Sequence, residues 1–308
     1  MDNLQLRIKK VILLFFIVKI SALYSLGLNS YDINERPDSI SVNKTKLTIA
    51  MSSSVFVVAG AYYAVKTAWW YDISPDFHFD QGADLHYSKN LDKVAHLFGG
   101  YVVQDLYYRS FRWSNMKEET ALWTSFGFSV FVQVMIDIKD GYAPHWGFSL
   151  YDVGAGALGA SFPVFQHYYP FLKNYKLKMS YWYKDDDYGS YPRNEAANIF
   201  EELPVEDYPN QTYWLTWNVD QVIPKKYDKY WPDFLDIAIG MGVDDLIDYP
   251  DTNGSVEWYL AFDYDLEVLV KNVDSPIVKS IAHYLNYIKF PSPAIRFTPE
   301  FKAYGFYF

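Results

Sequence analysis

Residues 149–160 read Ser-Leu-Tyr-Asp-Val-Gly-Ala-Gly-Ala-Leu-Gly-Ala, a run of small and apolar residues that holds one charge, Asp152. The pairs Ala155–Gly159 and Gly156–Ala160 have four-residue spacing, which puts small residues on one helix face. Small residues on a face let two helix backbones approach closely. The pattern predicts a helix over residues 149–167 that packs inside a bundle and carries a buried carboxylate.

Three more segments upstream have the composition of helices. Residues 47–65 carry no charge, and nineteen helical residues would span about 28 Å, close to the bilayer core of about 30 Å. Serines at residues 52–54 dilute this segment, so a buried packing helix and a membrane span both stay open. Residues 90–112 and 117–139 are the other two expected helices.

The pattern changes after Tyr175 to short alternating segments that are rich in aromatic residues and broken by Pro, Asn, Asp and Gly, as in strands. One helix, Pro276 to Ile288, is expected among them. The expected strands are Leu177–Tyr183, Thr212–Val219, Ile237–Val243, Trp258–Leu266, Ala294–Thr298 and Lys302–Phe308. The fold class is therefore α+β, with a bundle of about four helices, open to a membrane-embedded reading, over residues 29–174 and a small antiparallel β region over 175–308.

Tyr304, Phe306 and Phe308 alternate in the last segment, as in many outer-membrane barrels. Six short strands are too few to close an eight-stranded barrel. A small sheet that lies on the helices or on a membrane surface is the favoured interpretation, with the barrel as the alternative.

The start of the chain resembles an export signal. Arg7, Lys9 and Lys10 precede an apolar run over residues 11–18, and small residues follow where a peptidase could cut. The sequence predicts a signal peptide over residues 1–28 and an exported protein, with an uncleaved N-terminal anchor as the alternative.

The composition of the 308 residues excludes several classes of protein. With 27 Lys and Arg against 37 Asp and Glu, the net charge is −10, which argues against nucleic-acid binding. The chain has no cysteine, so a disulfide scaffold, a thiolate zinc site, a cysteine nucleophile and an acylated lipoprotein cysteine are all excluded. Its 29 Tyr and 10 Trp are residues that concentrate at membrane and partner surfaces. The expected partner is a membrane lipid or an envelope protein.

Five charged or titratable side chains lie in the apolar helices, where an unpaired charge is costly to bury. Asp92 and His96 share one helix face, Asp137 and Asp140 share another, and Asp152 lies one turn into its helix. In a bundle all five can converge on one site. His96, Asp137 and Asp140 are candidate ligands of a divalent metal, and all five are candidate acid–base groups.

Structural roles are the alternatives. Asp92 can cap its helix while His96 pairs with it, and Ser149 with Asp152 forms a capping-box pattern. Asp137 and Asp140 lie at a helix C-terminus, where negative charge is unfavourable, so both need a partner.

The order of these motifs resembles known families. LDKVAH at residues 91–96, the acids Asp137 and Asp140, and SLYDVGAG at residues 149–156 are similar to the YfiM-like family of predicted periplasmic proteins of unknown function. The same order resembles the VanZ-like membrane proteins. The resemblance covers about residues 85–165, and it implies the periplasm or the outer membrane of a Gram-negative bacterium, with membrane association.

Two more stretches, residues 211–215 and 290–295, resemble the longer YfiM-like members. There are two departures from the family. Some members are lipoproteins, whereas this chain has no cysteine, and many carry an Asn where this chain has Gly156.

Two functions follow from these observations. The first is an exported, membrane-associated envelope protein with a structural or binding role, in which the Asp/His cluster locks the helices. The second is a metal- or acid/base-dependent enzyme that acts on an envelope lipid or glycan-lipid. The sequence has no H-E-x-x-H, no G-x-S-x-G and no phosphate-cradling Gly loop, which favours the first.

Overall fold

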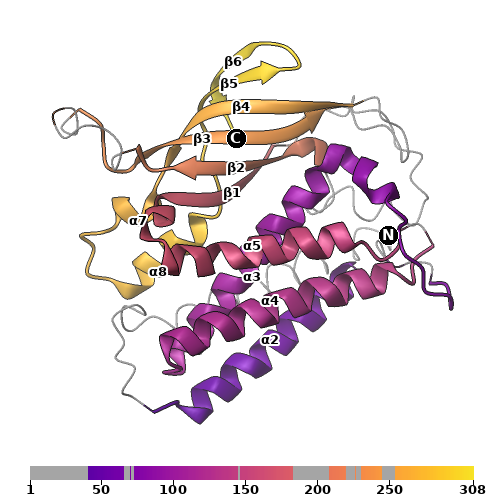
Figure 1. Cartoon of the computed structure of the whole chain (residues 1–308). Helices are drawn as coiled ribbons and strands as arrows, with labels where there is room; N and C mark the ends of the chain where they lie inside the picture. Colours follow the sequence, from indigo (N-terminus) through magenta and orange to yellow (C-terminus); the bar gives the residue numbers. More distant parts are fainter. Residues whose placement is uncertain are drawn as a thin grey trace, which may run out of the picture.

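In the computed structural model the helices come first and a twisted sheet follows, covering one side of them (Figure 1). The predicted signal peptide, residues 1–28, lies outside the described residues. The structure describes residues 41–65, 70, 73–144, 146–182, 208–219, 226, 230–244 and 254–308.

Four long helices form the bundle, as the sequence predicts. They are α2 (Lys44–Val65), α3 (Leu91–Trp113), α4 (Glu118–Asp140) and α5 (Leu150–Tyr168). A kinked 3₁₀ segment, η2 (Ala83–Asn90), leads into α3. The aromatic side chains of α3 and α4 interlock, with the rings of Tyr107 and Phe128 stacked at 5.3 Å between centroids.

Helices α3 and α5 approach each other through glycine. A Cβ atom on Gly159 would overlap the backbone carbonyl of Leu97, and one on Gly100 would overlap the carbonyl of Gly156. Gly156, Gly159 and Ala160 are buried. The close approach predicted from the small residues of this helix is confirmed.

The C-terminal half forms one six-stranded antiparallel sheet in the order β1-β2-β3-β4-β5-β6, so β1 and β6 are its edges. All six predicted strands are present. Their bounds are β1 (Tyr175–Tyr181), β2 (Gln211–Trp217), β3 (Leu235–Asp244), β4 (Ser255–Tyr264), β5 (Ser292–Thr298) and β6 (Lys302–Tyr307). Two helices, α7 (Leu266–Leu269) and α8 (Pro276–Leu285), connect β4 to β5.

One end of the sheet packs against α3. Leu91 of α3 lies in a buried cluster with Tyr213 of β2 and Val243 of β3, and the ring of Phe98 contacts Tyr213 edge to face. This cluster fixes the sheet to the bundle.

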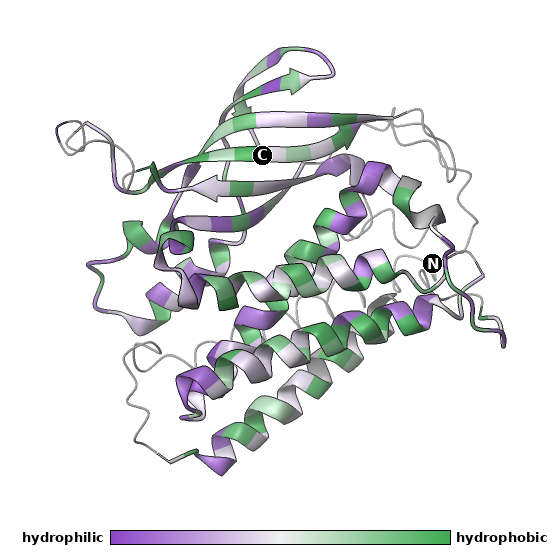
Figure 2. Ribbon diagram, in the orientation of Figure 1, coloured by the Kyte–Doolittle hydropathy of each residue, from purple (hydrophilic) through white to green (hydrophobic). Residues whose placement is uncertain are grey.

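Helix α4 buries polar side chains and exposes apolar ones. Its buried face carries Ser125, Ser129, Gln133 and Asp137. Its exposed face carries Trp123, Phe131, Met135 and Ile138. In water the usual arrangement is the reverse, with the apolar stripe facing the core. Figure 2 shows the visible side of α4 as largely hydrophobic.

By length and composition alone, α4 is the one helix in the described part of the chain that could cross a membrane. Of its most apolar 18-residue stretch, 33% is buried. The exposed sides of its neighbours are also apolar, with Leu158 of α5 57% exposed and Val55 of α2 65% exposed.

The covered face of the sheet holds an aromatic core, which includes Trp214, Tyr259 and Tyr307, together with buried charges. On that face Lys178, Asp236, Glu257 and Asp263 are buried. On the other face four side chains that pair in register across the strands form an apolar row: Leu215, Ile239, Leu260 and Ile295. Each member of this row is between 39% and 47% exposed. Antiparallel sheets with one face in water normally carry polar side chains on that face, so the apolar row is unusual for a solvated surface. Both halves of the molecule thus turn apolar side chains outward.

Candidate functional site

The N-termini of α3 and α5 are joined by one lysine between two carboxylates. The Lys93 ammonium donates to Asp92 Oδ2 at 2.6 Å and lies 2.9 Å from Asp152 Oδ1. Side-chain exposures of 13%, 4% and 11% for Lys93, Asp92 and Asp152 place the three charges away from water. The structure therefore brings Asp92 and Asp152 together, and Lys93 is the residue that joins them.

His96 connects α3 to the other two helices. Its Nδ1 lies 3.0 Å from Oε1 of Gln133 on α4, and its Nε2 lies 4.0 Å from Oδ2 of Asp152 on α5. Asp92 pairs with Lys93, one residue along, while His96 bonds to the Gln133 amide.

The Gln133 side chain also packs against the backbone of Gly156, which has no side chain of its own. A Cβ atom on Gly156 would collide with the Gln133 side chain. The Gln133 side chain packs directly on Gly156, and its amide bonds to His96.

The two acids at the end of α4 have the partners that their position requires. The Ser149 backbone N–H donates to Asp137 Oδ1 at 3.3 Å, and the Trp70 indole N–H donates to Asp140 Oδ1 at 2.7 Å. Ser149 is the N-cap of α5, where its Oγ accepts from the Asp152 N–H at 3.1 Å. Ser149 thus caps the helix, but the expected capping box is incomplete, because the Ser149 N–H donates to Asp137 and not to Asp152.

The candidate metal ligands face different groups in the structure. His96 contacts Gln133, Asp137 contacts the Ser149 backbone and Asp140 contacts Trp70. Among the residues that the structure describes, no group of three or more His, Asp or Glu side chains is arranged to hold a metal ion. The contacts of the cluster link three helices: Lys93 pairs with carboxylates on α3 and α5, and His96 bonds to Gln133 on α4.

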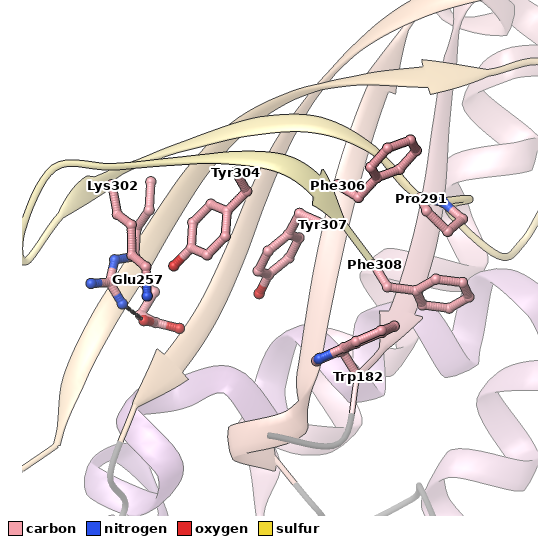
Figure 3. Close-up of a pocket in the computed structure, with 9 residues that line it drawn as sticks. Trp182, Glu257, Pro291, Lys302, Tyr304, Phe306, Tyr307 and Phe308 are labelled. Carbon is pink, nitrogen blue, oxygen red and sulfur yellow. Dashed lines mark hydrogen bonds and ion pairs between the residues drawn. The ribbon is translucent and has the colours of Figure 1, made fainter. Parts of the chain in front are cut away.

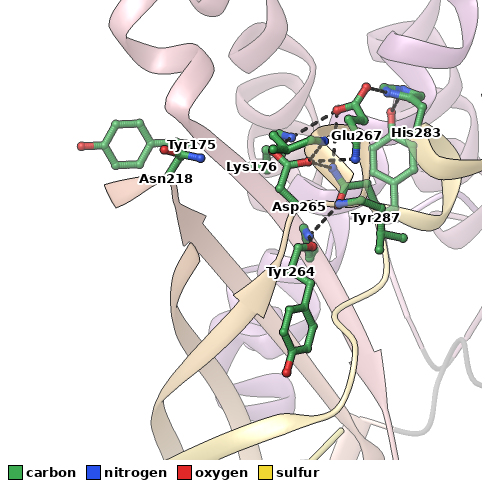
Figure 4. Close-up of polar contacts among 12 residues, drawn as sticks. Tyr175, Lys176, Asn218, Tyr264, Asp265, Glu267, His283 and Tyr287 are labelled. Carbon is green, nitrogen blue, oxygen red and sulfur yellow. Dashed lines mark hydrogen bonds and ion pairs between the residues drawn. The ribbon is translucent and has the colours of Figure 1, made fainter. Parts of the chain in front are cut away.

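A second polar network joins the bundle to the sheet region, and the sequence analysis did not find it (Figure 4). Asp105 and Arg109 of α3 pair at 2.8 Å, and Asp105 also accepts from His283 Nε2 at 2.8 Å and from the Tyr287 hydroxyl at 2.7 Å. The other ring nitrogen of His283 donates to Glu267 of α7 at 2.9 Å.

Lys176 of β1 extends this network into the sheet. Its ammonium donates to Asp265 at 2.7 Å and to Glu267 at 3.1 Å. Figure 4 shows these side chains gathered where β1, α7 and α8 meet. Through these contacts β1, α7 and α8 are linked to Asp105 and Arg109, which lie one turn apart on α3.

The charges of the network shift its pKa values in opposite directions. Burial and the Arg109 charge lower the pKa of His283, but the carboxylates of Asp105 and Glu267 raise it more, so that pKa lies above its ordinary value. Burial raises the pKa of Asp105, but Arg109 and His283 lower it well below the usual range. The two carboxylates therefore favour the protonated imidazole of His283, against the nearby Arg109 guanidinium.

Sequence spacing gives little signal for this network. Asp105 and Arg109 lie four residues apart, which is common for a pair on a solvated helix face. Their partner His283 lies 178 residues from Asp105. The hint that the sequence offers is the charged pair of Asp105 and Arg109 in an aromatic-rich segment of the helix.

Comparison with known proteins places the predicted cluster inside a family match. Residues 82–168 match the model of a family described as "Predicted periplasmic lipoprotein (DUF2279)". The matched residues include α3, α4 and α5 with Asp92, His96 and Asp152. The match supports an exported, periplasmic and membrane-associated location. No curated protein and no solved structure matches the chain.

Proposed function

We propose that the protein is an exported envelope protein that binds membrane lipid through its outward apolar side chains, in the periplasm or outer membrane of a Gram-negative cell. Its role is structural or binding. The two polar networks hold the helices and the sheet in the arrangement that presents those side chains.

The inverted burial of α4 carries this proposal. Phe131 is 58% exposed and Met135 is 48% exposed, whereas Gln133, which lies between them in sequence, is 3% exposed. Exposing large apolar side chains to water is unfavourable, and the buried Gln133 amide needs its hydrogen bond to His96 to offset its desolvation. In contact with lipid tails the exposed apolar side chains carry no such cost, because the surrounding medium is as apolar as they are. Polar side chains such as Gln133 are then better placed inside the protein than facing the lipid.

The sheet supports the same conclusion from a different part of the fold. The apolar row of Leu215, Ile239, Leu260 and Ile295 crosses four strands on one face. Trp258 and Phe262 of β4 point to the same face and are 38% and 40% exposed. Aromatic residues of this kind are enriched where a protein meets the bilayer interface.

Flotation with vesicles of phosphatidylethanolamine and phosphatidylglycerol tests the proposal. The parent chain is expected to float with the vesicles. The double variant Phe131→Glu with Leu158→Glu is expected to stay largely at the bottom of the gradient, because each carboxylate would have to enter the apolar layer.

The double variant Phe131→Leu with Leu158→Ile is the matched control and is expected to float like the parent. Circular dichroism of both variants checks that the fold is kept. A parent chain that stays at the bottom, or a folded diglutamate variant that floats as well as the parent, would show that these faces do not bind lipid.

A further inference from the structure

A pocket of about 310 Å³ lies along β6, apart from both polar networks (Figure 3). Volumes of about 300 Å³ and above are typical of sites for small molecules. Its lining comes from β4, β5, β6 and the two segments that flank the sheet: Trp182, Glu257, Pro291, Arg296, Lys302, Tyr304, Phe306, Tyr307 and Phe308.

The two ends of the pocket differ in character. Figure 3 shows Lys302 and Glu257 at one end and Phe308 and Trp182 at the other, with two tyrosine rings between them. The rings of Trp182 and Phe308 lie 6.0 Å apart. A ligand that fills this pocket needs one polar end and one apolar end.

The polar end carries a net positive charge. The Arg296 guanidinium is paired with the Glu257 carboxylate, which also accepts from the Tyr259 hydroxyl at 2.6 Å. The exposed ammonium of Lys302 lies 5.1 Å from the Tyr304 ring centroid, and within the described part of the chain it makes no ion pair. Two cations against one carboxylate leave a single positive charge for a ligand.

Tyr304 adds a second donor beside Lys302. In the region that the structure describes, its hydroxyl makes no hydrogen bond, and Figure 3 shows it directed toward the end that holds Glu257. Burial raises the pKa of Tyr304 above its ordinary value, so the hydroxyl keeps its proton at neutral pH. An ammonium and a neutral hydroxyl together suit a carboxylate or a phosphate.

The apolar end has the features of a site for a hydrocarbon chain. Phe306 is 81% exposed, the largest exposure among the exposed apolar side chains of the described residues. Phe308 and Pro291 add apolar surface, and among the described residues no charged side chain lines this end. A bound chain would cover these rings.

We infer that this pocket binds an anionic amphiphile, with its carboxylate or phosphate at Lys302 and Tyr304 and its hydrocarbon chain along Phe306, Phe308 and Trp182. A fatty acid and a lipid with a phosphate headgroup share this chemistry. The site does not require the membrane contact proposed above, so either proposal can fail without the other.

Calorimetric titration of the full chain in a non-ionic amphipol tests the inference. The probes are octanoate, octyl phosphate, octan-1-ol, acetate and inorganic phosphate. Octanoate or octyl phosphate is expected to bind at one site, at least tenfold more tightly than octan-1-ol and than the two small anions. Tighter binding of octanoate assigns a fatty-acid ligand, and tighter binding of octyl phosphate assigns a lipid phosphate.

Lys302→Met is expected to weaken binding of the preferred probe at least tenfold, and Tyr304→Phe severalfold. Lys279→Met removes another exposed lysine, on α8, and is expected to bind like the parent. The inference is overturned if neither octyl anion binds, if octan-1-ol or a small anion binds equally well, or if Lys302→Met binds like the parent.

Discussion

At the scale of single residues, Lys93 is the side chain that connects α3 and α5 within the predicted cluster. It is a single cation in contact with two buried carboxylates, Asp92 and Asp152, that belong to different helices. Removing one partner of a buried ion pair leaves a charge without compensation, which is more costly than the pair itself.

Lys93→Met is therefore expected to lower the free energy of unfolding by about 3 kcal/mol, measured by urea denaturation. Lys173→Met replaces an exposed lysine and serves as the control, with an expected change within about 0.5 kcal/mol. Equal stability of Lys93→Met and the parent would show that the cluster does not lock the helices.

Asp236 on the inner face of β3 gives a dependence on pH. Burial, helped by the Asp265 charge and opposed by Lys176 and Lys178, raises the pKa of its carboxyl from 3.8 to about 7. The native state then binds the proton more tightly than the unfolded chain, so ionisation of Asp236 reduces stability as the pH rises from about 4 to about 7.

Asp236→Asn is expected to raise the free energy of unfolding at pH 8 by about 1–3 kcal/mol, because the amide carries no buried charge. The gain should shrink toward zero below about pH 3, where the parent carboxyl is protonated in both states. Unfolding curves of both proteins at several pH values measure this difference. A difference that does not change with pH would contradict the assigned cause.

At the scale of secondary-structure elements, two glycines of α5 should respond in opposite directions to the same change. Gly159 faces the Leu97 carbonyl of α3, whereas Gly154 is exposed and has open space around it. Alanine favours the helix at both positions, but at Gly159 it has no room.

Gly159→Ala is expected to lower the unfolding temperature, with a loss of about 1–3 kcal/mol, because α3 and α5 must move apart. Gly154→Ala is expected to raise stability by about 0.5–1 kcal/mol. Thermal unfolding followed by circular dichroism measures both. Two shifts of the same sign would show that the close approach of α3 and α5 does not determine stability.

Most elements could be predicted because their residue patterns are long and periodic. The uncharged run in α4 and the alternation in β4 each span enough residues to separate a helix from a strand. Helix α7 was missed because Leu266–Leu269 is only 4 residues long, too short for any period to show.

Partners within the site were harder to predict than its members. Asp92 and His96 share a helix face by spacing, which favoured their pairing, whereas Asp92 pairs with its neighbour Lys93. Adjacent residues on a helix do not normally face each other. Here the long lysine side chain reaches both Asp92 and Asp152, and only the packing of α5 against α3 makes that possible.

At the scale of the whole molecule, the bundle and the sheet share one feature: both carry large apolar side chains on their outer faces. The inside of the sheet region combines a hydrophobic cluster around Trp214 and Tyr259 with the buried ion pair of Lys178 and Asp263, at 2.6 Å and 0% side-chain exposure. Leu158 of α5 and Leu260 of β4 are examples of the exposed apolar side chains on the outside. A chain that folds in this way satisfies its charges internally and leaves its apolar surface for another apolar medium.

The absence of cysteine allows that surface to be mapped with single spin labels. Labels at Phe131, Leu158 and Leu260 report on the outward apolar side chains, and a label at the exposed Asn272 is the reference for water. Collisions with oxygen, which concentrates in lipid, are compared with collisions with a water-soluble nickel chelate, in phosphatidylethanolamine and phosphatidylglycerol vesicles.

If the outward side chains contact lipid, the three labels will collide readily with oxygen and rarely with the nickel chelate, opposite to the label at Asn272. If they collide with the nickel chelate as freely as the Asn272 label does, the apolar faces are in water and the proposed membrane contact is wrong.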